Sequence, residues 1–145
     1  MKKTSICLLL LVVLSCVSSA AISIPISSVK AGLAGGTLRL SAVIEKPFRD
    51  FLVDYELGLG VGNQYSVLTG GISGKCYIKP NMYAGLGINY SSYSDPVSLS
   101  LGGNVSDRAG FGLGAFIGTN LKDNMYAQVG FETRLGGIAE IGYSF

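Results

Sequence analysis

Two acidic residues have the spacing that carboxylate chemistry would need. Asp54 and Glu56 are separated by one residue in a segment of alternating polarity, so on a β-strand both carboxylates lie on one face. Such a pair can act as general acid and general base. No other residue supports a catalytic cleft, because the chain contains no histidine and therefore lacks Ser-His-Asp arrangements and histidine-containing metal sites. We predict that the protein is not an enzyme and holds no cofactor or metal.

The same face of the neighbouring segments carries charges of both signs. The simplest hairpin registers place Ile44 opposite Phe51, Val61 opposite Leu68, and Leu135 opposite Ala139. These registers predict three ion pairs: Arg39 with Glu56, Asp54 with Lys75, and Arg134 with Glu140. Charges that are removed from water need such partners. The sequence therefore predicts charge pairing within an enclosed interior.

The elements that carry these charges are predicted from a two-residue periodicity. In 51–61 the odd positions are all apolar, whereas the even positions hold the acids and two glycines. Seven further segments follow the same rule, which predicts an all-β fold of eight antiparallel strands. The predicted strands are 26–34, 37–45, 51–61, 67–78, 82–92, 109–119, 125–135 and 138–145. Gly35-Gly36 is a two-residue hairpin signal, and 79–81 and 136–138 are predicted three-residue loops.

The first 20 residues have the features of a secretory signal peptide. Lys2 and Lys3 precede an apolar run at 6–14, and small residues occupy 18–20. Val13 to Cys16 also resembles a lipobox, so lipidation of Cys16 remains a second interpretation. The predicted mature chain, 21–145, has as many basic as acidic residues. It has no basic patch that would favour nucleic acid as a partner.

The alternation alone leaves open which face is inside. The apolar face points outward if the chain is a membrane barrel, and inward if it is a secreted soluble barrel that resembles a lipocalin. The charged face also holds many glycines, which suit a crowded and strongly curved interior better than a solvated surface. The strand lengths also match those needed to cross hydrocarbon at a tilt. The sequence therefore favours the eight-stranded up-and-down transmembrane barrel.

The C-terminus supports this interpretation and points to a family. Ile141, Tyr143 and the final residue Phe145 lie at alternate positions of the last strand. With the signal peptide and the even strand count, this tail resembles small eight-stranded bacterial outer-membrane barrels, the group of the OmpA membrane domain, OmpX and opacity-like surface antigens. The resemblance covers about residues 26–145. It implies that the tail is read by barrel-assembly machinery, and that periplasmic chaperones and outer-membrane lipid are partners.

The resemblance also implies a topology, with both termini in the periplasm. Residues 46–50, 79–81 and 120–124 then become periplasmic turns, and 91–108 becomes an extracellular loop. Its candidate contact residues for an unknown ligand are Tyr93, Asp95, Asp107 and Arg108. A solvated loop without a specific adhesion surface is the simpler interpretation.

The function predicted from the sequence is that of a non-enzymatic outer-membrane barrel. An eight-stranded barrel has an interior just wide enough for side chains to fill, so the paired charges are expected to plug it. The barrel would then serve a structural role or a surface-exposed binding role. Two alternatives stay open: a narrow ion or small-solute channel lined by Asp54, Glu56, Glu132 and Glu140, and a secreted soluble barrel that binds apolar ligands.

Overall fold

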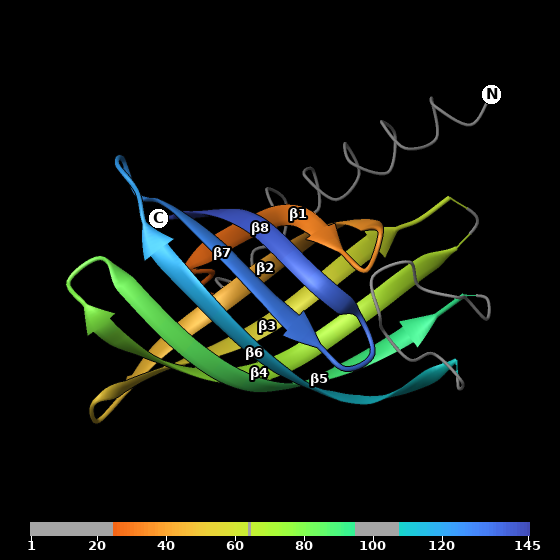
Figure 1. Cartoon of the computed structure of the whole chain (residues 1–145), viewed down its shortest axis with the longest axis horizontal. Coiled ribbons are helices and arrows are strands. Elements are labelled where there is room, and N and C mark those ends of the chain that lie inside the picture. Colours follow the sequence, from red (N-terminus) through yellow and green to blue (C-terminus); the bar gives the residue numbers. More distant parts are fainter. Residues whose placement is uncertain (1–24, 64, 95–107) are drawn as a thin grey trace.

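A computed structural model describes residues 25–63, 65–94 and 108–145, which form a closed antiparallel β-barrel (Figure 1). The eight strands are β1 (Ser28–Ala34), β2 (Thr37–Phe48), β3 (Phe51–Val61), β4 (Ser66–Lys79), β5 (Met82–Tyr93), β6 (Ala109–Asn120), β7 (Met125–Glu132) and β8 (Gly136–Ser144). Each strand pairs with its neighbours in sequence, and β1 closes the barrel against β8. The predicted all-β, eight-stranded, up-and-down barrel is therefore confirmed.

The predicted signal segment at 1–20, with Cys16, lies outside the described residues. Within the described part of the chain, no helix has the length and apolar character needed to span a membrane.

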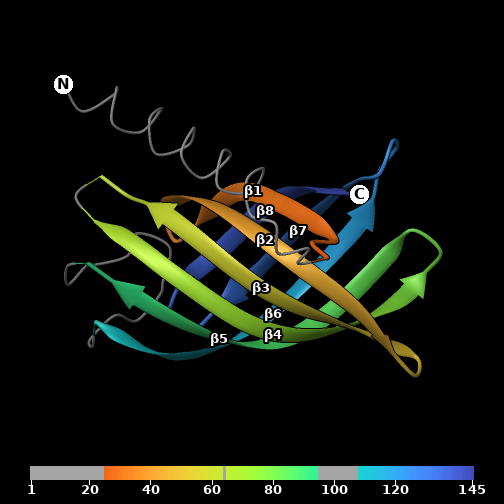
Figure 2. The same ribbon diagram turned by 180° about the vertical axis from the view of Figure 1, so that it is seen from behind.

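The two ends of the barrel differ in their connections (Figures 1 and 2). At one end, here called the turn end, lie the short connections 49–50, 80–81 and 121–124 together with the C-terminal Phe145. At the other end, here called the loop end, lie the connections that follow β1, β3, β5 and β7. In Figure 1 the turn end is on the left and the loop end on the right.

The first hairpin forms as predicted. Ala34 pairs with Thr37 across Gly35 and Gly36, whose φ angles are 57° and 89°. A two-residue turn with positive φ at both positions matches the twist of the flanking strands, and glycine adopts it without steric cost.

The β2–β3 hairpin has a different register from the predicted one. Phe48, not Ile44, lies opposite Phe51, so the ladder continues four residues further than expected. The turn is reduced to Arg49 and Asp50, because Arg49 adopts a left-handed φ of 55° that a tight turn requires. The prediction that β2 ends at residue 45 is therefore wrong.

The next two hairpins also depart from their predicted registers or loops. Val61 pairs with Ser66 and not with Leu68, since Gly62 donates a backbone hydrogen bond to Tyr65 and closes a shorter connection. The predicted three-residue loop at 79–81 is a two-residue turn combined with a register shift between Tyr77 and Lys79. This β-bulge keeps the rest of β4 and β5 in phase.

The largest correction concerns the β7–β8 connection. Residues 133–135 form the turn, and Glu132 pairs with Gly136, so the predicted loop at 136–138 is wrong. The Glu132 carboxylate accepts hydrogen bonds from the backbone N–H groups of Arg134 (2.9 Å) and Leu135 (3.0 Å). Gly136 completes the turn with a φ of 82°. The predicted alternation of 125–135 would put Leu135 on the apolar outward face with Val129 and Phe131, but Leu135 is instead buried at the loop end.

The structure shows which face of the sheet is inside. Large apolar side chains point outward: Leu86, Phe111 and Leu113 are 71%, 75% and 63% exposed. The charged face lines the interior, where Arg39 and Glu140 are each 3% exposed. Interior glycine leaves room for the larger side chains, because a Cβ atom at Gly142 would overlap the Tyr126 ring. The interior is thus narrow, polar and filled by side chains.

Candidate functional site

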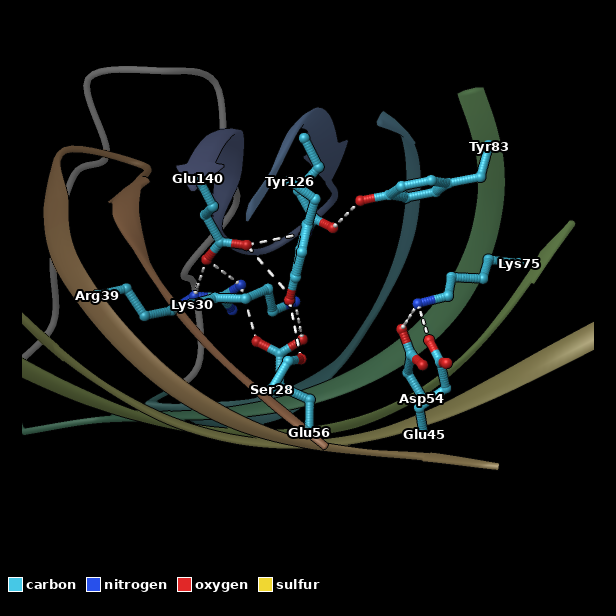
Figure 3. A network of polar contacts seen from close by, with 11 residues as sticks. Ser28, Lys30, Arg39, Glu45, Asp54, Glu56, Lys75, Tyr83, Tyr126 and Glu140 are labelled. Carbon is cyan, nitrogen blue, oxygen red and sulfur yellow. Dashed lines mark hydrogen bonds and ion pairs between the residues drawn. The ribbon is translucent and has the colours of Figure 1, made fainter. Parts of the chain in front are cut away.

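Four charged side chains from β1, β2, β3 and β8 meet in the middle of the interior (Figure 3). Lys30 Nζ lies 2.5 Å from Glu56 Oε2 and 3.6 Å from Glu140 Oε2. Arg39 Nη2 lies 3.0 Å from Glu56 Oε1 and 2.6 Å from Glu140 Oε1, and Arg39 Nε also donates to Glu140 Oε1 at 2.8 Å. We call these four residues the central network. Its two cations and two carboxylates balance, as burial requires.

Polar side chains surround Glu140 and fix its position. Gln128 Nε2 donates a hydrogen bond of 2.9 Å to Glu140 Oε2, so both carboxylate oxygens are engaged. Tyr83 donates in turn to Gln128 Oε1 at 3.4 Å. Tyr126, on the same strand as Gln128, shares a hydrogen bond of 3.0 Å between its hydroxyl group and that of Ser28 on β1. The interior is therefore crossed by hydrogen bonds as well as by ion pairs.

A second charged group lies nearer the turn end. Lys75 from β4 forms ion pairs with Asp54 (Nζ to Oδ2, 3.1 Å) and with Glu45. The same ammonium group lies 5.3 Å from the centre of the Tyr83 ring, a distance that allows a cation–π contact. One lysine thus serves two carboxylates, and Figure 3 shows this group beside the central network.

The loop end is closed by the β7–β8 turn and by apolar side chains. Val67, Tyr93 and Leu135 form a buried cluster, against which Tyr65 and Ile138 pack. Below this cluster, Arg134 Nε donates to Ser91 Oγ at 2.9 Å, and Glu132 is 0% exposed. The barrel therefore has an apolar plug at the loop end above its charged interior.

The three predicted ion pairs have different outcomes. Arg39 meets Glu56 and Asp54 meets Lys75, although neither pair lies directly opposite in the register. Their long side chains bridge the offset across the narrow lumen. Arg134 does not pair with Glu140, because the β7–β8 turn begins earlier than predicted and carries Arg134 to the loop end. Glu140 pairs with Arg39 and Lys30 in its place.

Sequence reasoning missed three members of the interior: Lys30, Glu45 and Gln128. The alternation in 26–34 and 37–45 places Lys30 and Glu45 on the charged face, but the predicted registers give neither of them a partner. The partners of Lys30 depend on closure of β1 against β8, where Lys30 lies opposite Gly142. Gln128 carries no charge, and only its position on the charged face of β7 could have indicated it.

The predicted tail lies on the outer surface. Ile141, Tyr143 and Phe145 are all exposed, and the rings of Tyr143 and Phe145 lie 5.7 Å apart. Phe145 also donates its backbone N–H to the carbonyl of Ser27 at 3.0 Å, which ties the end of the chain to the strand that closes the barrel.

The predicted contact loop is described only in part. Tyr93 is 4% exposed because its ring joins the apolar plug, so its prediction as a surface contact residue is wrong. Arg108 is exposed. Asp95 and Asp107 lie outside the described residues.

A small cavity of about 30 Å³ lies beside the central network. Its lining includes Lys30, Arg39, Glu56, Gln128 and Glu132. This volume has room for about two water molecules. Residues 25–63, 65–94 and 108–145 contain no group of three or more Cys, Asp or Glu side chains placed to hold a metal ion. The described interior thus combines paired charges with a cavity of the size of a few water molecules.

Comparison with protein-family models, with curated proteins and with solved structures found no match to this chain.

Proposed function

We propose that this protein is a non-enzymatic integral membrane barrel of a bacterial outer membrane, with a lumen closed by paired charges. The barrel wall would serve a structural role in the membrane, and the loop end would be the part that binds a ligand outside the cell. Both termini then lie in the periplasm. Barrel-assembly machinery and periplasmic chaperones are the partners proposed for its biogenesis.

The observation that carries this proposal is the outward apolar surface. Exposed leucine, isoleucine, valine, phenylalanine and tyrosine side chains occur on the outer face of every strand. Monomeric soluble proteins rarely expose contiguous apolar patches larger than a few hundred Å². A closed barrel also leaves no unpaired sheet edge, which is the condition for placing strands in hydrocarbon.

The interior favours a plug over a wide pore. The central network and the Lys75 group cross the lumen, and the apolar plug of Val67, Tyr93 and Leu135 lies above them. A charged interior also disfavours the alternative of a soluble carrier, since apolar ligands need an apolar cavity.

A catalytic role for the two carboxylates of β3 is disfavoured by their contacts. Asp54 is paired with Lys75, and Glu56 is held by Lys30 and Arg39. A general base needs an accessible proton acceptor within reach of its substrate. Both carboxylates are instead occupied by cations inside the barrel, so they fit a structural role.

The test is folding of residues 21–145 into phosphatidylcholine vesicles from urea. A membrane barrel is expected to give β-sheet circular dichroism only in the presence of lipid, and a folded band that shifts on heating in detergent gels. It should also remain with the vesicles after a carbonate wash. A protein that folds as a soluble monomer in buffer without lipid or detergent would contradict the proposal.

A narrow channel is the second candidate, favoured by the small cavity that charged side chains of the central network line. Glu56 and Glu132 both line this cavity. If water filled the lumen on both sides of the cavity, these carboxylates would face ions that pass through it. Single-channel recording in planar bilayers separates the two candidates. The plugged barrel is expected to show no steady conductance, whereas discrete current steps that change in the Glu140→Gln variant would favour the channel.

A further inference from the structure

Four basic side chains are gathered at the turn end of the barrel. We call Lys46, Arg49, Lys79 and Lys122 the cationic rim; all four are exposed. Within the described part of the chain, none of them forms an ion pair. Two exposed acidic residues, Asp50 and Asp123, lie in the same turns, and the neighbouring Glu45 is paired with Lys75, so the turns carry two more basic than acidic side chains.

The strand registers place two of these cations on the outer face. Lys46 lies opposite Val53, a member of the outward apolar set of β3. Lys79 would share the inward face of Lys75 if β4 were regular. The bulge between Tyr77 and Lys79 instead pairs Lys79 with Met82, which belongs to the outward set of β5. A bulge re-aims the side chains that follow it. Here it moves a charge from the lumen side to the outside.

The cationic rim lies next to an aromatic and apolar belt. Phe48, Phe51, Ile78 and Phe145 are all exposed at this end of the barrel. The guanidinium carbon of Arg49 lies 5.9 Å from the centre of the Phe48 ring. Lysine and arginine can extend their alkyl stems along such a surface while the charged group reaches the polar boundary. Arg49, Lys79 and Lys122 thus lie at the turns, at or beyond this belt, whereas Lys46 lies one outward position inside Phe48 on β2.

We propose that the cationic rim binds the headgroup phosphates of anionic phospholipids in the leaflet at the turn end. This inference rests on the proposed membrane location. It commits to lipid because the cations continue the apolar outer surface instead of forming a separate patch. The sequence 95–108, which connects β5 to β6, has two acidic residues (Asp95 and Asp107) and one basic residue (Arg108). It therefore has no excess of positive charge like that of the cationic rim. The barrel would therefore favour anionic lipid on one side only.

The experiment measures which lipid the folded barrel prefers. The protein is folded into phosphatidylcholine vesicles that contain a trace of spin-labelled phosphatidylglycerol or spin-labelled phosphatidylcholine. The fraction of motionally restricted label gives the relative association constant of the two lipids. A cation near an anionic headgroup contributes about a fivefold preference. We expect phosphatidylglycerol to be favoured about fivefold at low salt, and the preference to disappear at high salt.

Two variants test whether the rim is the origin of this preference. K46Q/R49Q/K79Q/K122Q should reduce the association ratio to about one. D50N/D123N removes the two acids of the same end and should raise the ratio. Arg108→Gln, at the loop end, is the matched control and should leave most of the preference in place. The salt dependence of the unmodified protein supplies the answer if the fourfold variant does not fold.

Three results would overturn the inference: equal association of the two lipids, a preference that survives in the fourfold variant, or a preference that is insensitive to salt. These results leave the membrane proposal intact, because they presuppose a folded barrel in the vesicles. Failure to fold into zwitterionic vesicles would instead contradict the proposed function itself.

Discussion

Replacing Glu140 with glutamine removes one of the two carboxylates of the central network. Glu140 is 3% exposed, contacts Arg39 at 2.6 Å and Lys30 at 3.6 Å, and accepts a hydrogen bond from Gln128. The variant leaves the two cations to share Glu56 alone and places a new amide donor among donors. Loss of one partner of a buried ion pair typically costs 3 to 5 kcal/mol. Because Glu56 still compensates both cations in part, we expect the lower end, about 3 kcal/mol.

The assay is urea unfolding in phosphatidylcholine vesicles, followed by circular dichroism and by the heat-sensitive gel shift. Asp123→Asn is the control, since this exposed turn residue has a φ of 58° that asparagine also tolerates. It should change the free energy of unfolding by less than about 0.5 kcal/mol. The double variant Arg39→Gln/Glu140→Gln should recover part of the loss, because it removes a cation and a carboxylate together. Two results would refute the central network as a coupled unit. One is a free energy of unfolding of Glu140→Gln within about 0.5 kcal/mol of the unmodified protein. The other is a loss in the double variant that equals the sum of the two single losses.

Three further predictions concern other parts of the barrel. Leu113→Arg places a charge on the outer face of β6 and should cost roughly 2 to 4 kcal/mol in bilayers if the position lies near the midplane, whereas unchanged folding into vesicles would count against the outward face assignment. Leu135→Ala opens the apolar plug and should lower the free energy of unfolding by about 2 to 5 kcal/mol, with a normal urea midpoint as the contrary result. Glu132→Ala removes the acceptor for two backbone N–H groups of the β7–β8 turn. It should cost about 2 kcal/mol and increase amide hydrogen exchange at Arg134 and Leu135, and unaltered exchange there would show that the carboxylate does not hold the turn.

The strands and their faces could be predicted from the sequence because alternation is a local property. The period-two pattern around Asp54 requires only that successive side chains point to opposite sides of a strand. It placed Leu86, Phe111 and Leu113 on one face, and the structure shows that this face is the outer one. Eight such segments, all but one pair joined by short connections, have few ways to pair other than as neighbours, so the barrel followed from the same pattern.

The registers could not be predicted because each depends on a turn conformation. A left-handed Arg49 shortens the β2–β3 turn, and no sequence signal of the Asn-Gly kind announces it. The turn at 133–135 depends on a side chain, since Glu132 satisfies two backbone groups of its own connection. The glycines at 136 and 137 suggested a later turn, but only the first of them has a positive φ there.

The central network depends on closure of the barrel. Arg39 and Glu140 are 101 residues apart in sequence and meet because β1 joins β8. The stagger between strands decides which inward side chains lie at the same height, and it accumulates over all the hairpins of the barrel. The sequence thus indicated which residues are inside, such as Glu56 and Lys75, but could not determine every partner. Arg39 and Glu56 still meet, because a narrow lumen brings long side chains together across a register error.

The central claim is that the apolar outer face lies against lipid, and spin labels along β6 test it most directly. In a Cys76→Ser background, single nitroxides replace Phe111, Leu113 and Ala115 on the outer face, and Lys122 in an exposed turn serves as the water-accessible comparison. After folding into phosphatidylcholine vesicles, collision rates with oxygen and with a water-soluble nickel chelate are measured. We expect oxygen to reach the three outward labels readily while the chelate is excluded, and the chelate to reach the label at 122. Ready access of the nickel chelate to the labels at 111, 113 and 115 would contradict the central claim.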